Sequence, residues 1–251
     1  MRILVSNDDG VYSPGIAALA RALQQLGEIT VCAPQSEQSA VSRALTMSRP
    51  LRMEPVKVPG LDCPCWAVDG TPTDCVKLAI SRLFDAPPDI VVSGINNGAN
   101  LGSDVLFSGT VAAAMEGAMQ GIPAVAVSLS MGGETTFDQA AVWAAQAVRA
   151  ALATQLPLGT VMNVNVPSRQ PQGWKLTALG VLEYGETYEQ RQDPRGRNYY
   201  WLSGNKRPAD AQSDADDAWL ERGYLTVTPI KCDLTDYSLL QAWSQPGFLE
   251  K

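Results

Sequence analysis

The amino-acid sequence predicts an α/β protein built on a doubly wound, mainly parallel sheet. Short apolar runs rich in β-branched residues alternate with longer segments whose apolar residues recur every three or four positions. This alternation is typical of βα units, in which each helix returns the chain so that successive strands lie parallel. Pro14, Gly27 and Gly121 support the interpretation, because proline favours a first helical turn and glycine commonly follows a helix.

The N-terminal part of the chain supplies most of these units. We expect strands at 3–6, 29–33, 65–68, 90–93, 124–128 and 161–166. We expect helices at 14–26, 73–84, 110–121 and 137–156. Ile16, Leu19 and Leu23 recur at helical spacing in the first helix, so one of its faces should be buried against the sheet.

The pattern changes after Pro167. Residues 184–218 are rich in charged residues, Gly, Asn, Gln and Tyr and poor in aliphatic residues, so we do not expect them in a core. Strand-like runs at 175–181 and 224–230 flank this stretch, and an amphipathic helix is expected after Asp236.

We therefore divide the chain into a core of residues 1–168 and a C-terminal extension of residues 169–251, which should hold a β-hairpin and the terminal helix. The aromatic run 199–202 lies inside the polar stretch. An exposed strand with these side chains needs a partner, which makes it a candidate oligomer contact. A surface loop with an aromatic plug is the alternative.

Composition limits the classes of partner. The 251 residues are 45% hydrophobic and 18% charged, which suits a globular protein with a sizeable core. The net charge of -7 and a pI of about 4.7 oppose a polymeric nucleic-acid partner, since binding to a phosphate backbone needs a cationic surface. A small anionic ligand stays compatible, because N–H groups and one cation can reverse the potential locally.

The start of the chain and its cysteines favour a cytoplasmic location without membrane attachment. The apolar run 3–5 turns polar at Ser6, which is too short for a secretory signal, and no run is long enough to cross a membrane. Five cysteines form an odd count without a CxxC repeat, which suits reduced thiols better than a disulfide framework. Cys63 and Cys65 around Pro64 are compatible with metal or redox chemistry, but we expect them to line a loop.

The chain contains no histidine. This absence excludes Ser-His-Asp and Cys-His hydrolases, phosphohistidine chemistry and histidine-ligated metal sites as self-contained mechanisms. Catalysis would have to use oxygen groups, lysine, cysteine or the backbone.

Three loops that follow predicted strands carry unusual polar residues, and doubly wound sheets bind ligands at this edge. In the first loop, Asp8 and Asp9 lie between Asn7 and Gly10. A simple turn is the alternative, but two adjacent carboxylates repel each other unless a cation or donor compensates. The second loop, 93–104, combines three asparagines with three glycines, so it is either a flexible loop or a source of neutral oxygen ligands.

The third loop, Ser108, Gly109 and Thr110, opens a helix of small residues. A helix N-terminus with free N–H groups and hydroxyls suits a phosphate. An ordinary N-cap by Ser108 is the commoner explanation, but a position beside the carboxylate pair favours phosphate binding. The GxGxxG, GxxxxGK[ST] and GxSxG fingerprints are absent.

Five blocks of the sequence carry a family resemblance. They are SNDDG at 6–10, APQSEQSAVSRALT at 33–46, GTPTDCV at 70–76, VVSGINNGANLGSDVLFSGTVAAAMEG at 91–117 and DPRG at 193–196. In these blocks and in their order, the chain resembles the stationary-phase survival protein SurE family of metal-dependent nucleotidases. The resemblance implies a Rossmann-like core and homo-oligomers, dimers or tetramers, assembled through C-terminal extensions. Tyr12 and Arg43 stand in regions where family members often carry histidine.

The resemblance also implies one divalent metal ion per subunit. Its ligands would be Asp8, Asp9, the Ser39 hydroxyl and the side-chain oxygen of Asn96. Such hard oxygen ligands suit Mg²⁺ or Mn²⁺ better than zinc. Asp8 and Asp9 would also be the catalytic residues, and either is able to accept the proton of an attacking water.

The implied reaction is the hydrolysis of nucleoside monophosphates to nucleoside and phosphate by a metal-activated water. This is a 5'-nucleotidase activity, to which 3'-nucleotidase and exopolyphosphatase activities are possible additions. Asn96, Ser108, Gly109 and Thr110 would bind the phosphate.

Two alternatives belong to other classes. An aspartyl-phosphate enzyme usually places its carboxylates in a DxD pattern, whereas here they are adjacent. A non-catalytic nucleotide-binding module on the same fold is harder to dismiss, because fold does not determine function.

Overall fold

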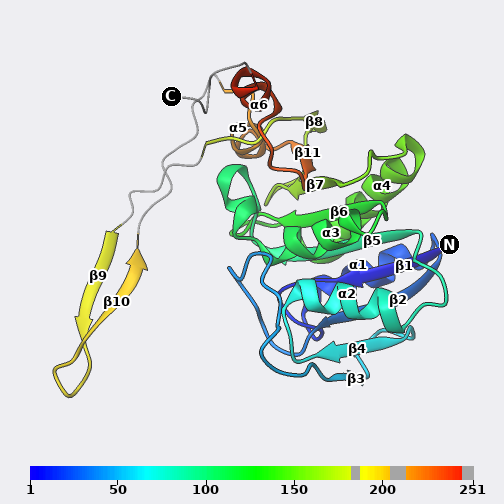
Figure 1. The fold of residues 1–251 in the computed structure, drawn as a ribbon, viewed down its shortest axis with the longest axis horizontal. Helices are drawn as coiled ribbons and strands as arrows, with labels where there is room; N and C mark the ends of the chain where they lie inside the picture. The colour runs from blue at the N-terminus through cyan, green and yellow to red at the C-terminus, as the bar shows by residue number, and fades with distance from the viewer. Residues whose placement is uncertain (182–186, 204–212, 245–251) are drawn as a thin grey trace.

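The strands of the protein form one large sheet and a separate hairpin. The computed structural model describes residues 1–181, 187–203 and 213–244. The large sheet consists of β1 (Arg2–Ser6), β2 (Glu28–Pro34), β3 (Met53–Pro55), β4 (Cys65–Val68), β5 (Ile90–Asn97), β6 (Ala124–Leu129), β7 (Thr160–Val166), β8 (Trp174–Leu176) and β11 (Leu225–Lys231). Its strand order is β3-β4-β2-β1-β5-β6-β7-β11-β8 (Figure 1).

The centre of this sheet is parallel and its edges are mixed. All neighbouring strands from β4 to β7 are parallel, whereas β3 runs antiparallel to β4 and β11 antiparallel to β7. From β1 the chain builds outward through β2 to β4, and then continues on the other side of β1 with β5, β6 and β7. The predicted doubly wound fold is confirmed, and its strand order reverses between β1 and β5, the position where such sheets bind ligands.

Helices cover both faces of the sheet (Figure 1). On one face α1 (Pro14–Leu23) packs against α4 (Phe137–Thr154), and on the other α2 (Pro72–Arg82) packs against α3 (Gly109–Met119). In the described ranges, no helix is long and apolar enough to cross a membrane.

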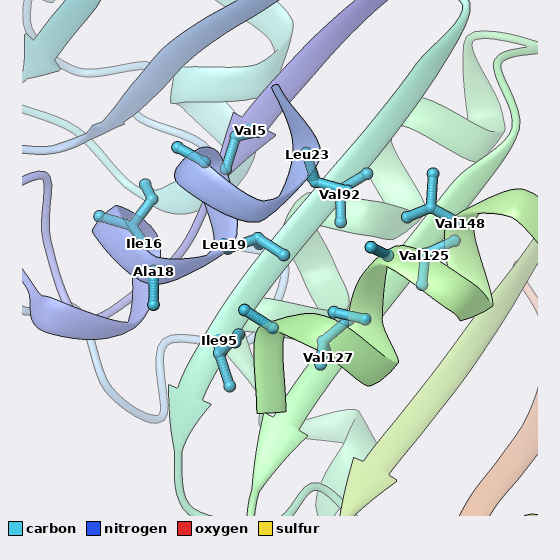
Figure 2. Close-up of a cluster of buried hydrophobic side chains, with 14 of the residues drawn as sticks. Val5, Ile16, Ala18, Leu19, Leu23, Val92, Ile95, Val125, Val127 and Val148 are labelled. Atoms are coloured by element: carbon cyan, nitrogen blue, oxygen red, sulfur yellow. The ribbon is translucent and has the colours of Figure 1, made fainter. Parts of the chain in front are cut away.

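The two faces of each central strand contribute to different halves of the core. In β1, Ile3 and Val5 belong to the cluster that contains α1 and α4, whereas Leu4 belongs to the cluster that contains α2 and α3. This division follows from the alternation of side chains along a strand. Figure 2 shows the first cluster, where Leu19 of α1 packs among valines of the central strands such as Val92.

Side-chain caps determine where the main helices begin. Ser13, Thr71 and Thr136 are N-caps whose hydroxyls accept hydrogen bonds from the first turns of α1, α2 and α4. Each predicted helix is present, but α1 ends at Leu23 rather than at 26. The N–H of Leu26 donates to the carbonyl of Leu23 (2.8 Å), so the last residues form a tighter turn.

The strand predicted at 90–93 is longer in the structure, because β5 continues to Asn97. A bulge between Ser93 and Asn96 shifts the register against β6 and lets pairing resume beyond it. Part of the predicted loop 93–104 is therefore strand.

The strand predicted at 175–181 is shorter, since β8 ends at Leu176. Thr177 still donates its N–H to the carbonyl of Val227 (3.0 Å), and the chain then leaves the sheet. Three short elements have no counterpart in the prediction: β3, the 3-10 helix η1 (Gly102–Leu106) and α5 (Asp216–Glu221). Elements of this length are too short for periodicity to detect.

The C-terminal extension contributes to two separate structures. Its strands β8 and β11 complete one edge of the main sheet. The division of the chain into a core and an extension at residue 168 remains a prediction. Its strands β9 (Thr187–Gln192) and β10 (Asn198–Ser203) pair with each other as a hairpin that extends away from the sheet (Figure 1). The carboxylate of Asp193 accepts the N–H groups of Arg195 and Arg197 and holds the hairpin turn.

The aromatic run 199–202 thus has a strand partner within its own chain, yet every residue of β10 is exposed. The terminal helix is present as α6 (Tyr237–Trp243), and none of its residues is buried. Within the polar stretch 184–218, residues 184–186 and 204–212 lie outside the described residues.

The burial of Leu19 predicts that its replacement by alanine destabilises the protein far more than the same replacement at the exposed Leu158. Leu19 is 0% exposed in the core, whereas Leu158 is 82% exposed. We expect Leu19→Ala to lower the free energy of unfolding by about 2–5 kcal/mol, because it leaves a cavity. Leu158→Ala should change it by less than about 0.5 kcal/mol. Urea denaturation of both variants measures the difference, and equal effects would contradict the described packing.

Candidate metal and phosphate site

The acidic loop after β1 lies at the switch point and has a well-defined conformation. The Asn7 side chain is buried and donates to the Gly10 carbonyl (3.0 Å) and to the Ser13 hydroxyl (2.7 Å). Its Oδ1 accepts the N–H of Gly10 (3.2 Å), and Gly10 has a φ of 100°, which favours glycine. Asn7 therefore closes the turn and leaves Asp8 and Asp9 as the carboxylates available to a ligand.

Asp8 is buried against the start of α3. Its exposed fraction is 4%, and its carboxylate accepts hydrogen bonds from the hydroxyl and the backbone N–H of Thr110. A Cβ added at Gly109 would lie 2.7 Å from the Cβ of Asp8 and 2.9 Å from its Oδ2. The glycine is therefore required for this close approach, and Thr110 holds the carboxylate in place.

Ser108 has a structural role in addition to any contact with a ligand. Its hydroxyl accepts the N–H of Val111 (3.1 Å) and so caps α3. The N-cap alternative that the sequence allowed is thus present. Phosphate binding by the Ser108, Gly109, Thr110 segment remains a prediction.

Asp9 lies next to the end of β5, where Asn96 and Asn97 are located. The Asp9 Oδ2 accepts the N–H of Asn97 at 3.3 Å, which joins the acidic loop to the end of β5. The Asn96 Nδ2 donates to the carbonyl of Gly98 at 2.7 Å. Because its amide nitrogen is used in this bond, the Oδ1 of Asn96 is directed elsewhere and can act as a ligand oxygen.

Ser39 reaches the site through the loop after β2. The N–H of Gln38 donates to the Asp8 carbonyl (2.8 Å), which ties this loop to the acidic loop. The Ser39 hydroxyl donates to the Glu37 Oε1 at 2.6 Å and keeps its lone pairs for a cation. Glu37 was not identified as a site residue in the sequence analysis, because no spacing in the sequence distinguishes it from a surface glutamate.

One open cavity of about 360 Å³ collects most of the predicted residues. Its lining includes Asp8, Asp9, Ser39, Asn96 and Ser108. Gly109 and Thr110 are not among the lining residues and lie behind Asp8. The second predicted loop, 93–104, also contributes Asn97, Ala99, Asn100 and Asp104 to the lining. The other lining residues were not singled out in the sequence analysis and are Glu37, Ala40, Phe107 and Met131.

The cavity is strongly acidic. Among the described residues that line it, none is lysine or arginine. Burial raises the pKa of Asp8. Burial and, secondly, the charge of Asp8 raise the pKa of Asp9 from 3.8 to about 6.

A divalent cation fits this donor set. A cation between the carboxylates of Asp8 and Asp9 would favour the ionised form of both, which burial otherwise disfavours. The neighbouring Ser39 and Asn96 supply neutral oxygens as further ligands. In the described part of the chain, no cluster of three or more His, Cys, Asp or Glu side chains is arranged to hold a metal. The donor set is therefore mixed, with two carboxylates and two neutral oxygens, as Mg²⁺ and Mn²⁺ accept.

A buried asparagine network supports the loop after β5. Asn100 donates its N–H to the Asn165 Oδ1 (2.8 Å) and its Nδ2 to the Ser128 hydroxyl (2.7 Å). Its carbonyl accepts the Nδ2 groups of Asn163 and Asn165, each at 2.9 Å. Because buried polar groups need partners, the two asparagines within the apolar strand β7 indicate such a network from the sequence. This signal was not used in the sequence analysis.

Fold and site together define a class: doubly wound α/β proteins with an oxygen-lined, acidic cavity at the switch point. The chain matches the family model described as Survival protein SurE over residues 3–186. It therefore belongs to the SurE family, as the sequence resemblance predicted.

Individual relatives agree with this assignment. The chain is 47% identical over 242 residues to the 5'-nucleotidase SurE of Pelotomaculum thermopropionicum, covering 96% of this chain and 93% of that protein. It is 48% identical over 253 residues to the 5'-nucleotidase SurE 1 of Thermus thermophilus, covering 100% and 98%. The crystal structure of the SurE protein from Aquifex aeolicus is similar with a TM-score of 0.86 and 37% identity, covering 100% of both chains.

The raised pKa of Asp9 predicts a pH effect on the metal-free protein. A carboxyl group whose pKa is higher in the folded state stabilises the fold most at low pH, and this contribution is lost as the pH rises from 3.8 to about 6. Asparagine does not titrate. We therefore expect Asp9→Asn, measured by urea denaturation with EDTA, to be more stable than the wild type at pH 7, with the difference shrinking towards pH 4.

Asp85→Asn is the matched control, because Asp85 is exposed on the loop after α2. It should show no such pH-dependent gain. The same pH dependence in wild type and Asp9→Asn would show that neither burial nor the charge of Asp8 disfavours the ionised form of Asp9.

Proposed function

We propose that this chain is a divalent-metal-dependent 5'-nucleotidase that hydrolyses nucleoside 5'-monophosphates to nucleoside and phosphate. The observation that carries the proposal is the gathering of Asp8, Asp9, Ser39, Asn96 and Ser108, from four separate chain segments, around one acidic cavity. Both relatives described above carry the name 5'-nucleotidase, which supports the same reaction.

We propose that one Mg²⁺ or Mn²⁺ per subunit is held by Asp8, Asp9, the Ser39 hydroxyl and the Asn96 Oδ1. When bound, such an ion would polarise a phosphoryl oxygen and lower the pKa of a coordinated water. The chemistry of the donors supports this metal class, since all four are oxygens.

The two carboxylates are suited to different tasks. Burial raises the pKa of Asp8, and the two hydrogen bonds that its carboxylate accepts from Thr110 oppose this rise and occupy lone pairs that an incoming proton would need. Asp9 accepts one from the backbone of Asn97 and is less buried. Asp9 is therefore the better acceptor for the proton of an attacking water, and Thr110 is a positioning residue that acts through Asp8.

Phosphate contact is assigned to the side chain of Asn96 and to the start of α3 at Ser108 and Gly109. Ser108 lines the cavity, and the positive end of the helix dipole faces the same region. An anion bound there would also be close to the metal ligands, as transfer of a phosphoryl group requires.

The organic part of the substrate has an apolar wall available. Phe107 and Met131 line the cavity and are 61% and 64% exposed, although the rest of the lining is mostly polar. An aromatic ring and a thioether suit the face of a nucleobase. Phe107 directly precedes Ser108, so a phosphate at Ser108 would place the attached nucleoside beside this wall.

Assembly and location are further parts of the proposal. Exposed apolar side chains gather on β10, at Tyr200, Trp201 and Leu202, and on α6, at Leu240 and Trp243. They support a homo-oligomer, a dimer or tetramer, in which a second copy covers them. The five free cysteines support a cytoplasmic location.

Phosphate release tests the reaction and its ligands. We expect the wild type to release phosphate from nucleoside 5'-monophosphates with Mn²⁺ or Mg²⁺ but not with EDTA. Asp8→Asn and Asp9→Asn should each lower kcat/KM by about a hundredfold or more, because several kcal/mol of charge stabilisation depend on the ion. Asp85→Asn should retain wild-type activity. Nucleotide binding by the wild type without phosphate release would instead identify a non-catalytic binding module.

A base-free substrate tests the apolar wall. We expect Phe107→Ala to raise KM for a nucleoside 5'-monophosphate by about 3- to 10-fold with little change in kcat. Hydrolysis of glycerol 3-phosphate, which has no base, should be unchanged. The control is Leu106→Ala, because Leu106 is 55% exposed and does not line the cavity. Equal losses on both substrates would refute the base contact without refuting the reaction.

A further inference from the structure

Two cysteine side chains face each other at the start of β4, on the far side of β2 from the acidic loop. The Sγ atoms of Cys63 and Cys65 are 3.9 Å apart, and the Cys65 thiol donates to the carbonyl of Cys63 at 3.3 Å. Neither cysteine lines the acidic cavity. Cys63 lies in a bend just before β4, which begins at Cys65, and this bend leaves the two sulfur atoms facing each other across Pro64.

The backbone between the two thiols is held on both sides. The carbonyl of Pro64 accepts the N–H of Val31 at 2.9 Å, and the carbonyl of Cys65 accepts the N–H of Val56 at 2.9 Å. Pro64 itself has a restricted φ. Little conformational entropy is therefore lost when the two sulfur atoms approach further, to the S–S bond length of about 2.05 Å.

The two thiols differ in access and in acidity. Cys63 is half-buried and lines an open cavity of about 520 Å³, whereas Cys65 is 4% exposed. The hydrogen bond between the two side chains lowers the pKa of Cys63 to about 7, and the same interaction raises the pKa of Cys65. Cys63 is thus suited to attack an external reagent first, and Cys65 is suited to attack the product that forms on Cys63.

We propose that Cys63 and Cys65 form a reversible dithiol site that reacts with small disulfides of the glutathione class and closes to an intramolecular disulfide. A metal site is a poorer explanation, because no third His, Cys, Asp or Glu completes a cluster among the described residues. The inference does not depend on the proposed hydrolytic function.

The reaction balances in two exchange steps. The Cys63 thiolate attacks one sulfur of the small disulfide, whose S–S bond breaks and releases one small thiol, so that a mixed disulfide remains on Cys63. The Cys63 thiolate is then gone and no longer accepts a hydrogen bond from Cys65, which removes the largest cause of the raised pKa of Cys65. The Cys65 thiol loses its proton to solvent and attacks the Cys63 sulfur, releasing the second small thiol. The protein loses two hydrogen atoms and two electrons, which reduce the small disulfide.

A second cysteine pair provides an internal control. The Cys32 thiol donates to the carbonyl of Cys75 at 3.4 Å, and both residues are 0% exposed in the core. These thiols are close together but closed to solvent, so we expect them not to react in the folded protein. Cys232, which has no second cysteine beside it in the described residues, can form at most a mixed disulfide.

The test is intact-mass and peptide-mass analysis of the folded, full-length protein after incubation with oxidised glutathione. We expect the wild type to lose two hydrogen atoms, with the bond mapped to Cys63 and Cys65, and to recover them with dithiothreitol. Cys65→Ser should instead retain one glutathione on Cys63, and Cys63→Ser should show neither product at Cys65. Cys232→Ser should close the disulfide as the wild type does.

Two results would overturn the proposal. One is a glutathione adduct on Cys63 that persists in the wild type as it does in Cys65→Ser, because Cys65 would then not act as the second thiol. The other is oxidation of Cys32 and Cys75 at the same rate, because the reaction would then require unfolding. Phosphate release should be the same before and after oxidation, since β2 separates β4 from β1.

Discussion

The burial of two adjacent carboxylates, Asp8 and Asp9, is the constraint around which the candidate site is arranged. Two adjacent carboxylates end a buried strand, and burial raises the pKa of both. The surrounding structure compensates in part, through the hydrogen bonds from Thr110 to Asp8 and from Asn97 to Asp9. No cationic side chain completes this compensation among the described lining residues. A divalent cation is the simplest partner that would, which is why the metal proposal follows from electrostatics as well as from family membership.

Close backbone approach is the second requirement of this arrangement. A Cβ at Gly109 would collide with Asp8, and one at Gly15 would lie 2.0 Å from the carbonyl oxygen of Ile95. The first contact brings α3 against the acidic loop, and the second brings the start of α1 against β5. Both glycines therefore serve the convergence of segments at the switch point, where any side chain would push the segments apart.

The asparagine network connects this site to the other half of the sheet. Asn100 follows β5, whereas Asn163 and Asn165 belong to β7, and β6 lies between the two strands. Asn165 of β7 also faces Thr226 of β11, which is the strand that the C-terminal extension adds to the sheet. The extension thus has a structural connection to the candidate site. Its strands β8 and β11 share one sheet with the strands that precede residue 168.

The sequence by itself determined the fold class, the location of the acidic loop and the family. The periodicity of apolar residues indicates whether a segment buries one face or two. Because doubly wound sheets bind ligands at the carboxyl ends of their strands, the loops after Ser6 and Ser93 could then be selected from the sequence. The sequence did not determine how far β5 extends, because the bulge that lets the strand continue depends on pairing with β6.

Tertiary structure alone decided which distant residues meet. Ser39 and Glu37 reach the cavity because the loop after β2 is bonded to Asp8, and Thr110 reaches Asp8 across 102 sequence positions. Asn163 and Asn165 acquire their role only when β7 lies two strands from β5. Local sequence patterns encode local conformation, whereas these contacts depend on strand order and helix packing, which place segments side by side regardless of their separation along the chain.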